Sequence, residues 1–215
     1  MTEPRAYHHG NLSRVLLDSA LALFIERGSF DFTLRELARK AGVTHNAPYR
    51  HFAGKAELLA ALREEGFALL AERCRAGLAA LDSETDPSDA ARARVRVLGE
   101  AYVRFALEHP HHFRLMLHNP LGGEAGRTSG DAFLILRETL AAAQRAGVVR
   151  GDLDARELAL GAWSLVHGLA SLIVEGNVPS SEARLRRYVR LLDALFFEGA
   201  LERGTAAARR GRSRG

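Results

Sequence analysis

Apolar residues in this 215-residue chain recur at the three- and four-residue spacing of helices, and no segment of the sequence shows strand-like alternation. The first such stripe, over residues 11–27, contains Leu12, Leu16 and Leu23 and stops at Gly28. A helix buries residues at this spacing, whereas a half-buried strand buries every second residue. Frequent Ala, Leu, Arg and Glu also favour helices. The sequence therefore predicts an all-α fold, with Asn11 as the N-cap of its first helix.

Two short helices separated by a tight turn are predicted between residues 33 and 52. Thr33 and Glu36 have the spacing of a capping box, in which each side chain bonds the backbone of the other. Gly42 suits the left-handed end of the helix that they open. Thr44 can cap a third helix, His45 to Phe52. Two helices joined by three or four residues form a helix-turn-helix unit.

The second helix of such a unit enters the major groove of DNA with its N-terminal residues against the base edges. Asn46 has the chemistry to pair with adenine, Arg50 with guanine, and Ala47 with a thymine methyl group. Hydroxyl, aromatic and cationic side chains at the neighbouring helix starts suit phosphates. The candidate DNA-binding residues are Thr33, Arg35, Thr44, His45, Asn46, Ala47, Tyr49, Arg50, His51 and Lys55.

Four segments in this region, Thr33–Ala38, Ala41–Thr44, Tyr49–Phe52 and Lys55–Leu59, resemble the N-terminal signature of the TetR family of bacterial transcriptional regulators. The similarity covers about residues 11–60 with the spacing intact. Pro48 departs from it, since the family usually has Leu or another apolar residue there. The resemblance implies a DNA-binding domain at 8–56, a helical effector-binding and dimerisation domain at 57–200, and an Arg-rich disordered tail at 201–215.

A second, shorter resemblance lies in the C-terminal half, where Trp163, His167 and Gly168 are similar to the Trp-His-Gly subgroup of the family. The family's packing would direct one set of mostly aromatic residues into a ligand pocket, although aromatic residues at helical spacing also simply fill a core. His167 can equally be a core histidine whose ring is hydrogen-bonded. The candidate pocket residues are Phe67, Tyr102, Phe105, Phe113, Met116, Leu136, Trp163 and His167.

The last two predicted helices, within residues 154–197, are too apolar to face water on every side. In the family that the chain resembles, two such helices pair with their symmetry mates, so we expect a homodimer. Small residues such as Gly161, Gly168 and Ala170 would permit close helix approach. A two-fold dimer implies a palindromic DNA operator.

The composition limits where the protein can act and which kinds of site it can contain. The net charge of +4 comes from the tail, because residues 203–215 hold five arginines and no acid, leaving −1 for the rest. A lone cysteine, Cys74, excludes an intramolecular disulfide and a thiolate metal cluster. The sequence contains no secretion signal and no run of about 20 uninterrupted apolar residues. We expect a cytoplasmic protein with no membrane partner and no cofactor.

A group of histidines, His109, His111, His112 and His118, raises the alternative of a metal sensor, because imidazole is a common ligand of zinc and nickel. Their spacing is not that of a closed site, no thiolate lies near, and Pro110 interrupts the helix between them. We therefore expect a chance cluster and no metal.

The sequence contains no nucleophile elbow, phosphate-binding loop or zinc-protease motif, so no enzyme is expected. The function that the residues and the resemblance favour is a ligand-responsive transcriptional repressor, released from its operator by a small-molecule effector. One alternative is a small-molecule-binding helical protein whose helix-turn-helix unit is only structural. Another is an activator or an architectural DNA binder.

Overall fold

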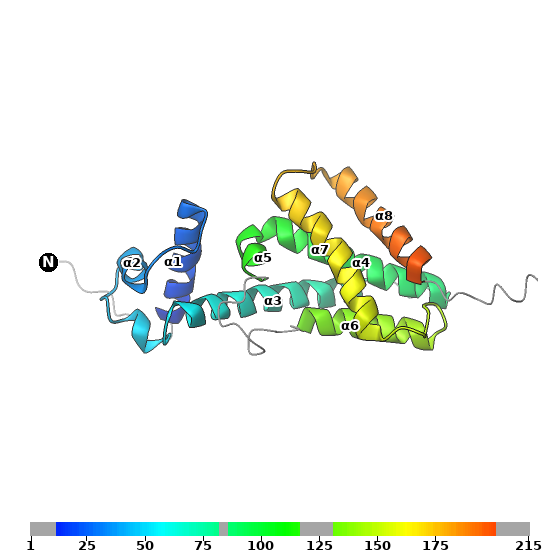
Figure 1. Cartoon of the computed structure of the whole chain (residues 1–215), viewed down its shortest axis with the longest axis horizontal. Coiled ribbons are helices and arrows are strands. Elements are labelled where there is room, and N and C mark those ends of the chain that lie inside the picture. Colours follow the sequence, from blue (N-terminus) through cyan, green and yellow to red (C-terminus); the bar gives the residue numbers. More distant parts are fainter. Residues whose placement is uncertain (1–11, 82–85, 117–130, 201–215) are drawn as a thin grey trace, which may run out of the picture. The chain divides into compact units, whose positions relative to one another are not determined.

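The computed structural model describes residues 12–81, 86–116 and 131–200, and in that part of the chain it contains eight α-helices, one 3-10 helix and no strand (Figure 1). The expected all-α fold is confirmed. The helices are α1 (Leu12–Arg27), α2 (Leu34–Lys40), η1 (Pro48–Arg50), α3 (Lys55–Ala79), α4 (Pro87–Glu108), α5 (Pro110–Met116), α6 (Asp131–Arg145), α7 (Ala155–Val174) and α8 (Glu182–Ala200).

The chain divides into two compact units. Unit 1 comprises Met1–Gly66 and His109–Thr128, and unit 2 comprises Phe67–Glu108 and Ser129–Gly215. Unit 1 thus contains α1, α2, η1, the first part of α3 and α5, whereas unit 2 contains the rest of α3 with α4, α6, α7 and α8. Residues 109–116 belong to unit 1 although the helices before and after them in the chain belong to unit 2.

Unit 1 is organised around one apolar cluster to which every one of its α-helices contributes. Leu16 from α1, Leu37 from α2, Leu58 from α3 and Leu115 from α5 are each fully buried in it. Burial of a leucine side chain contributes about 1.5–3 kcal/mol. This shared core matters because helices as short as α2 and α5, with seven residues each, are marginal in isolation.

The third helix that the sequence predicted, His45 to Phe52, is wrong in extent. The structure has only the 3-10 helix η1 at Pro48–Arg50, and no side chain caps it, so Thr44 is not its cap. Proline has no N–H for a bond to the carbonyl four residues earlier, and its ring clashes with that carbonyl. The Arg50 and His51 amides instead donate to carbonyls three residues back, those of Ala47 and Pro48.

Unit 2 is a helical bundle in which α7 packs on both α4 and α6, and α4 also contacts α6 and α8 (Figure 1). Its apolar cluster includes Val95, Leu140, Val149 and Phe197, all buried. The expected N-cap of α1, Asn11, lies outside the described residues.

Two helix starts in unit 2 have side-chain caps. The Asp86 carboxylate accepts from the amides of Ser88 and Asp89 at the start of α4, which begins at Pro87. Asp154 caps α7 and forms a capping box with Glu157. Proline suits the first turn of a helix because the amide it lacks has no partner there.

Helix α7 is long and apolar enough to cross a membrane by length and composition, yet only 22% of that 18-residue window is buried. Both α7 and α8 carry exposed apolar side chains. Leu160 is 53% exposed and Leu172 48% on α7, while Leu191 is 55% and Leu195 53% exposed on α8. A Cβ built on Gly161 or Gly168 of α7 would meet open space. These two helices therefore present apolar side chains that the described residues do not cover.

Candidate nucleic-acid interface

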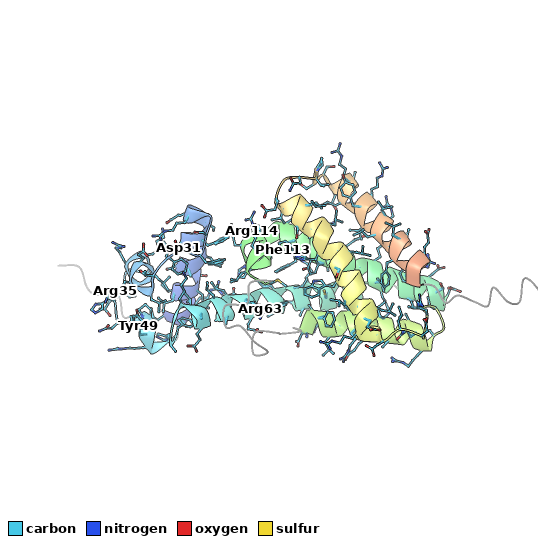
Figure 2. All side chains as sticks on the ribbon, in the orientation of Figure 1. Asp31, Arg35, Tyr49, Arg63, Phe113 and Arg114 are labelled. Atoms are coloured by element: carbon cyan, nitrogen blue, oxygen red, sulfur yellow. The ribbon has the colours of Figure 1, made fainter. Side chains whose placement is uncertain are left out.

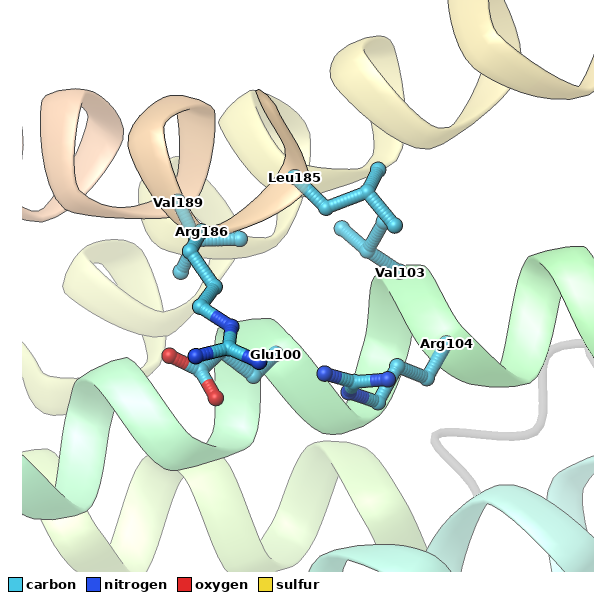
Figure 3. Close-up of a pocket in the computed structure, with 6 residues that line it drawn as sticks. All are labelled: Glu100, Val103, Arg104, Leu185, Arg186 and Val189. Carbon is cyan, nitrogen blue, oxygen red and sulfur yellow. The ribbon is translucent and has the colours of Figure 1, made fainter. Parts of the chain in front are cut away.

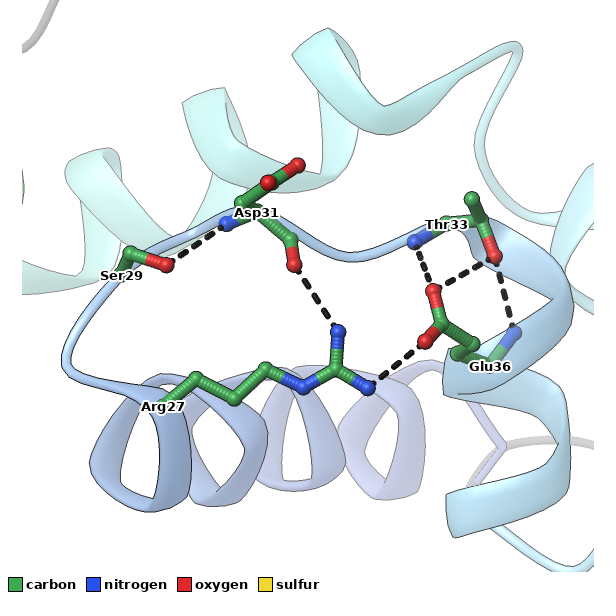
Figure 4. Close-up of polar contacts among 5 residues, drawn as sticks. All are labelled: Arg27, Ser29, Asp31, Thr33 and Glu36. Atoms are coloured by element: carbon green, nitrogen blue, oxygen red, sulfur yellow. Dashed lines mark hydrogen bonds and ion pairs between the residues drawn. The ribbon is translucent and has the colours of Figure 1, made fainter.

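A polar network fixes the corner between α1 and α2 (Figure 4). The Glu36 carboxylate accepts from the Thr33 amide at 2.8 Å and from the Thr33 hydroxyl at 2.9 Å, and the Glu36 amide donates to that hydroxyl at 3.2 Å. The predicted capping box is confirmed. Arg27, the last residue of α1, donates to Glu36 at 2.7 Å and to the Asp31 carbonyl at 2.8 Å. The cap of α2 is thus tied to the end of α1.

This network has electrostatic and functional consequences. Hydrogen bonds from Arg27 and then from Thr33 lower the pKa of Glu36 from 4.5 to about 2. Glu36 is therefore an anion at neutral pH. The Thr33 hydroxyl donates its proton to Glu36, so in this arrangement its oxygen can only accept further hydrogen bonds. Its predicted hydrogen bond to a DNA phosphate would require the hydroxyl to rotate and donate to the phosphate instead.

The turn between α2 and η1 depends on Gly42, which has a φ of +68° with open space around its Cβ position. Beyond it, the Val43 amide donates to the Ala38 carbonyl at 3.0 Å, and the Ala47 amide donates to the Thr44 carbonyl at 2.9 Å. Such a left-handed residue closes a helix and redirects the chain. The segment that follows is therefore held by its backbone, while its side chains remain available.

Exposure differs among the predicted base-reading residues. Thr44, His45, Asn46 and Arg50 are exposed. Ala47 is only 9% exposed, which leaves its methyl group mostly within unit 1.

Candidate phosphate-binding residues surround this segment. Tyr49 is 53% exposed although it is a large aromatic residue, and Arg35 is exposed on α2. Arg35 and Tyr49 project on the left side of the view in Figure 2. The Lys55 ammonium, at the first residue of α3, lies 5.1 Å from the ring centroid of buried Phe32. This cation–π contact holds the charge beside the helix start. His51 is half-buried beside η1.

Sequence reasoning did not identify Arg27 or Phe32 as supports of this surface. Arg27 reaches Glu36 across nine residues of chain, and Phe32 holds Lys55 across 23, so no helical periodicity connects either pair. The only sequence signals were the position of Arg27 directly before Gly28 and an aromatic residue directly before Thr33.

In unit 2, three of the candidate pocket residues form a continuous hydrogen-bonded network. Trp163 Nε1 donates to the Tyr102 hydroxyl at 3.0 Å, and that hydroxyl lies 2.8 Å from His167 Nδ1. His167 Nε2 lies 3.3 Å from the Ser171 hydroxyl. With the imidazole proton on Nε2, Tyr102 can donate to Nδ1 while its oxygen accepts from Trp163. Burial raises the pKa of Tyr102 to about 12 and lowers that of His167.

The other candidate pocket residues are distributed over both units. Phe67 and Phe105 are buried in unit 2 and Leu136 is half-buried there, whereas Phe113 and Met116 are buried on α5 of unit 1. A small pocket lies elsewhere, between α4 and α8 (Figure 3). Its volume of about 10 Å³ is that of one water molecule. It is lined by Glu100, Val103, Arg104, Leu185, Arg186 and Val189.

Three histidines of the candidate metal cluster lie on or beside α5, and His118 lies outside the described residues. His112 is 93% buried, and its ring centroid is 5.9 Å from that of His109. Within residues 12–81, 86–116 and 131–200, no group of three or more His, Cys, Asp or Glu side chains is arranged to hold a metal ion.

Comparison with known proteins agrees with both halves of this architecture. Residues 16–62 match the model of bacterial regulatory proteins of the tetR family, and residues 95–195 match the tetracyclin repressor-like C-terminal domain. Over 47 residues the chain is 51% identical to the HTH-type transcriptional regulator SrpR of Pseudomonas putida. That segment is 22% of this chain and 22% of SrpR, so the match spans about a fifth of the relative.

Solved structures resemble the chain over most of its length. A protein of unknown function from Rhodococcus sp. RHA1 is 33% identical, with a TM-score of 0.74 over 93% of this chain and 100% of that one. The regulator FadR of Bacillus subtilis, solved with stearoyl-CoA, has a TM-score of 0.68 over 86% of this chain and 98% of its own, at 15% identity. At that identity the likeness concerns the fold alone.

A helix-turn-helix corner followed by a separate helical unit is the architecture of a class of bacterial DNA-binding regulators. The chain belongs to the TetR family of bacterial regulatory proteins, as both family models and the HTH-type relative indicate.

Substituting Glu36→Gln should reduce the acid sensitivity of the protein. The folded-state pKa of about 2 lies below the ordinary 4.5, so the carboxylate stabilises the fold fully above about pH 4.5 and progressively less as pH falls toward 2. The thermal midpoint, followed by circular dichroism at 222 nm, should therefore fall less steeply between pH 5 and 3 in E36Q than in the unaltered chain. Glu138→Gln on α6 makes the same charge change away from the corner; parallel decline in all three proteins would contradict the expectation.

Proposed function

We propose that the protein is a ligand-responsive transcriptional regulator, a repressor that leaves a palindromic operator when a small-molecule effector binds. The observation that carries the proposal is the exposed set of Thr44, His45, Asn46 and Arg50 beside Tyr49 and Lys55, on a corner held by Arg27 and Glu36. Residues of these types match base edges and phosphates. The other side chains of the predicted set, including Thr33, Arg35, Ala47 and His51, stay part of the proposed interface.

The domain assignment follows the same logic. We assign DNA binding to residues 8–56, effector binding and dimerisation to 57–200, and an Arg-rich tail to 201–215, with the protein in the cytoplasm and without catalytic activity. We also assign the C-terminal domain to the Trp-His-Gly subgroup. The hydrogen bonds that join both Trp163 and His167 to Tyr102 support this assignment.

The first experiment is selection of sheared genomic DNA on the purified protein at about 0.15 M salt, where non-specific binding is weak. We expect enrichment of one two-fold symmetric sequence. The double variant Y49A/K55A should bind it more weakly, and the slope of its salt dependence should fall by about one unit for each phosphate that is no longer neutralised. Arg145→Ala, an exposed cation of α6, is the matched control and should bind as the unaltered chain does.

Flat enrichment with the folded protein, or unchanged affinity of Y49A/K55A, would instead favour a helix-turn-helix unit with a structural role only. Circular dichroism of each variant distinguishes a weakened interface from a failure to fold.

The second part of the proposal is a homodimer formed through α7 and α8. Four half-exposed leucines, Leu160, Leu172, Leu191 and Leu195, occupy the surface that these helices share. Burying that surface against its symmetry mate explains the high hydropathy of α7 better than a membrane span, since the family consists of DNA-binding regulators. The open space at Gly161 and Gly168 allows the partner helix to approach closely.

The double variant L191E/L195E should weaken dimerisation by at least about a hundredfold, because each leucine contributes about 1.5–3 kcal/mol when buried and each appears twice in a symmetric interface. Sedimentation equilibrium measures this as a shift from twice the chain mass to the single mass. Leu134→Glu, on α6 with 38% exposure, is the control and should remain dimeric. A monomeric unaltered chain, or a double variant as dimeric as the control, would contradict the assigned interface.

The third part is effector binding in unit 2 beside the Tyr102–His167 network. Half-buried Trp163 and His167 combine apolar surface with oriented polar groups, which is the usual composition of a small-molecule site. The candidate residues of this unit, Phe67, Tyr102, Phe105, Leu136, Trp163 and His167, are retained in this role, whereas the predicted Phe113 and Met116 belong to unit 1. The stearoyl-CoA complex of FadR supports a small-molecule ligand for this fold without defining its identity here.

A thermal-shift screen of a defined metabolite library should identify ligands that also weaken operator binding by about 5- to 150-fold at saturation. Trp163 is the only tryptophan, so the same ligands should change the intrinsic fluorescence with the same midpoint. Tyr102→Phe, which breaks the network, should alter that midpoint, whereas Tyr188→Phe on α8 should not. Ligands that stabilise the protein yet leave operator affinity unchanged would contradict the proposed regulation.

A further inference from the structure

Helix α5 is held in unit 1 by contacts to both α1 and α3. Leu115 is buried in the core of unit 1, and Arg63 Nε of α3 donates to the Met116 carbonyl at the end of α5, at 2.8 Å. A Cβ built on Gly66 would lie 3.1 Å from the His112 Cβ and 3.3 Å from Met116 Cγ, so the two helices meet closely there. The His112 ring can therefore become exposed to solvent only if α5 moves away from α3.

Two imidazole nitrogens on α5 are buried at this contact. His111 Nδ1 and His112 Nε2 have no hydrogen-bond partner among the described residues. The His111 ring packs edge-on against Phe24 of α1, with centroids 5.3 Å apart. His112 is 7% exposed, and its Nε2 lies 3.7 Å from the Glu65 carboxylate of α3, within ion-pair range but too far for a hydrogen bond.

Burial opposes protonation of both rings, and the charges around them act in both directions. Glu65, the anion nearest His112, is already bonded by Arg14 of α1 at 2.7 Å, and Arg14 also binds Asp18. Arg63 and Glu64 of α3 form an ion pair, and Arg114 and His109 add cationic or protonatable groups beside α5. Burial lowers the pKa of both His111 and His112, with Glu65 acting in the opposite direction on His112.

We propose that the docking of α5 in unit 1 is proton-sensitive: it is stable while His111 and His112 are neutral and is weakened when they take up protons. The open form binds protons more tightly, because its rings regain the ordinary pKa of about 6.5. The docked form is therefore fully stable above about pH 6.5 and loses stability as pH falls below that value. This places a pH-sensitive control within the same unit as the helix-turn-helix corner.

Hydrogen exchange of the full chain, followed by mass spectrometry of peptides covering 110–116, tests this between pH 7.5 and 5.5. After correction for the intrinsic exchange rate, the opening equilibrium of α5 should rise below pH 6.5 by up to about tenfold per pH unit for each proton taken up. Peptides from α6, which contains no histidine, serve as the internal reference.

The double variant H111Q/H112Q should lose most of this pH response, because glutamine keeps polar side chains without a titration in this range. The control H45Q/H51Q also removes two histidines of unit 1 and should keep the response. Glu65→Gln provides a variant that retains both histidines: it removes the carboxylate that favours charged His112, so the ratio of opening at pH 5.5 to that at pH 7.5 should increase. Equal protection of α5 at both pH values in the unaltered chain, or a response that persists in H111Q/H112Q, would overturn the proposal.

Discussion

The shared apolar core of unit 1 is the constraint on which the proposed DNA-binding surface depends. A seven-residue α2 and a three-residue η1 have too few backbone bonds to persist alone, since forming the first helical turn is itself unfavourable. Leu37 and Leu58, both fully buried, hold these short elements against α1 and the start of α3. The polar corner of Arg27, Thr33 and Glu36 then sets the direction of α2. The polar side chains of this segment can remain exposed because the buried residues behind them hold the backbone in place.

Much of the fold could be predicted because its signals are local. The stripe from Leu12 to Phe24, the stop at Gly28 and the pairing of Thr33 with Glu36 all lie within one helical turn or one helix length, and each is found in the structure. The error at residues 45–52 arose where one residue overrode the pattern. Pro48 removes an amide that a continuous α-helix needs, and the segment adopts a 3-10 turn instead.

The interactions that could not be predicted are those between residues far apart in the chain. The contact of Lys55 with Phe32, the bond from Arg63 to the Met116 carbonyl and the position of His112 beside Glu65 all require knowledge of which helices meet. In unit 2 the sequence selected Tyr102, Trp163 and His167 as possible partners of a ligand. The structure bonds them to one another, which is how buried polar groups are usually satisfied, and a ligand reaching them would compete with these bonds.

The glycines that end α1 and α2 carry a further consequence. Gly28 and Gly42 both have a φ of +68°, and neither has an atom within 4 Å of the position where a Cβ would stand. Neighbouring atoms therefore leave room for a side chain at both positions. An L-residue is disfavoured there because, at this dihedral angle, its Cβ comes too close to its own backbone. A residue of the opposite chirality, such as D-alanine, would fit both positions without strain and would restrict the unfolded chain more than glycine does. The geometry of the corner thus favours a mirror-image residue, and glycine is the encoded residue that adopts this dihedral angle at the lowest cost.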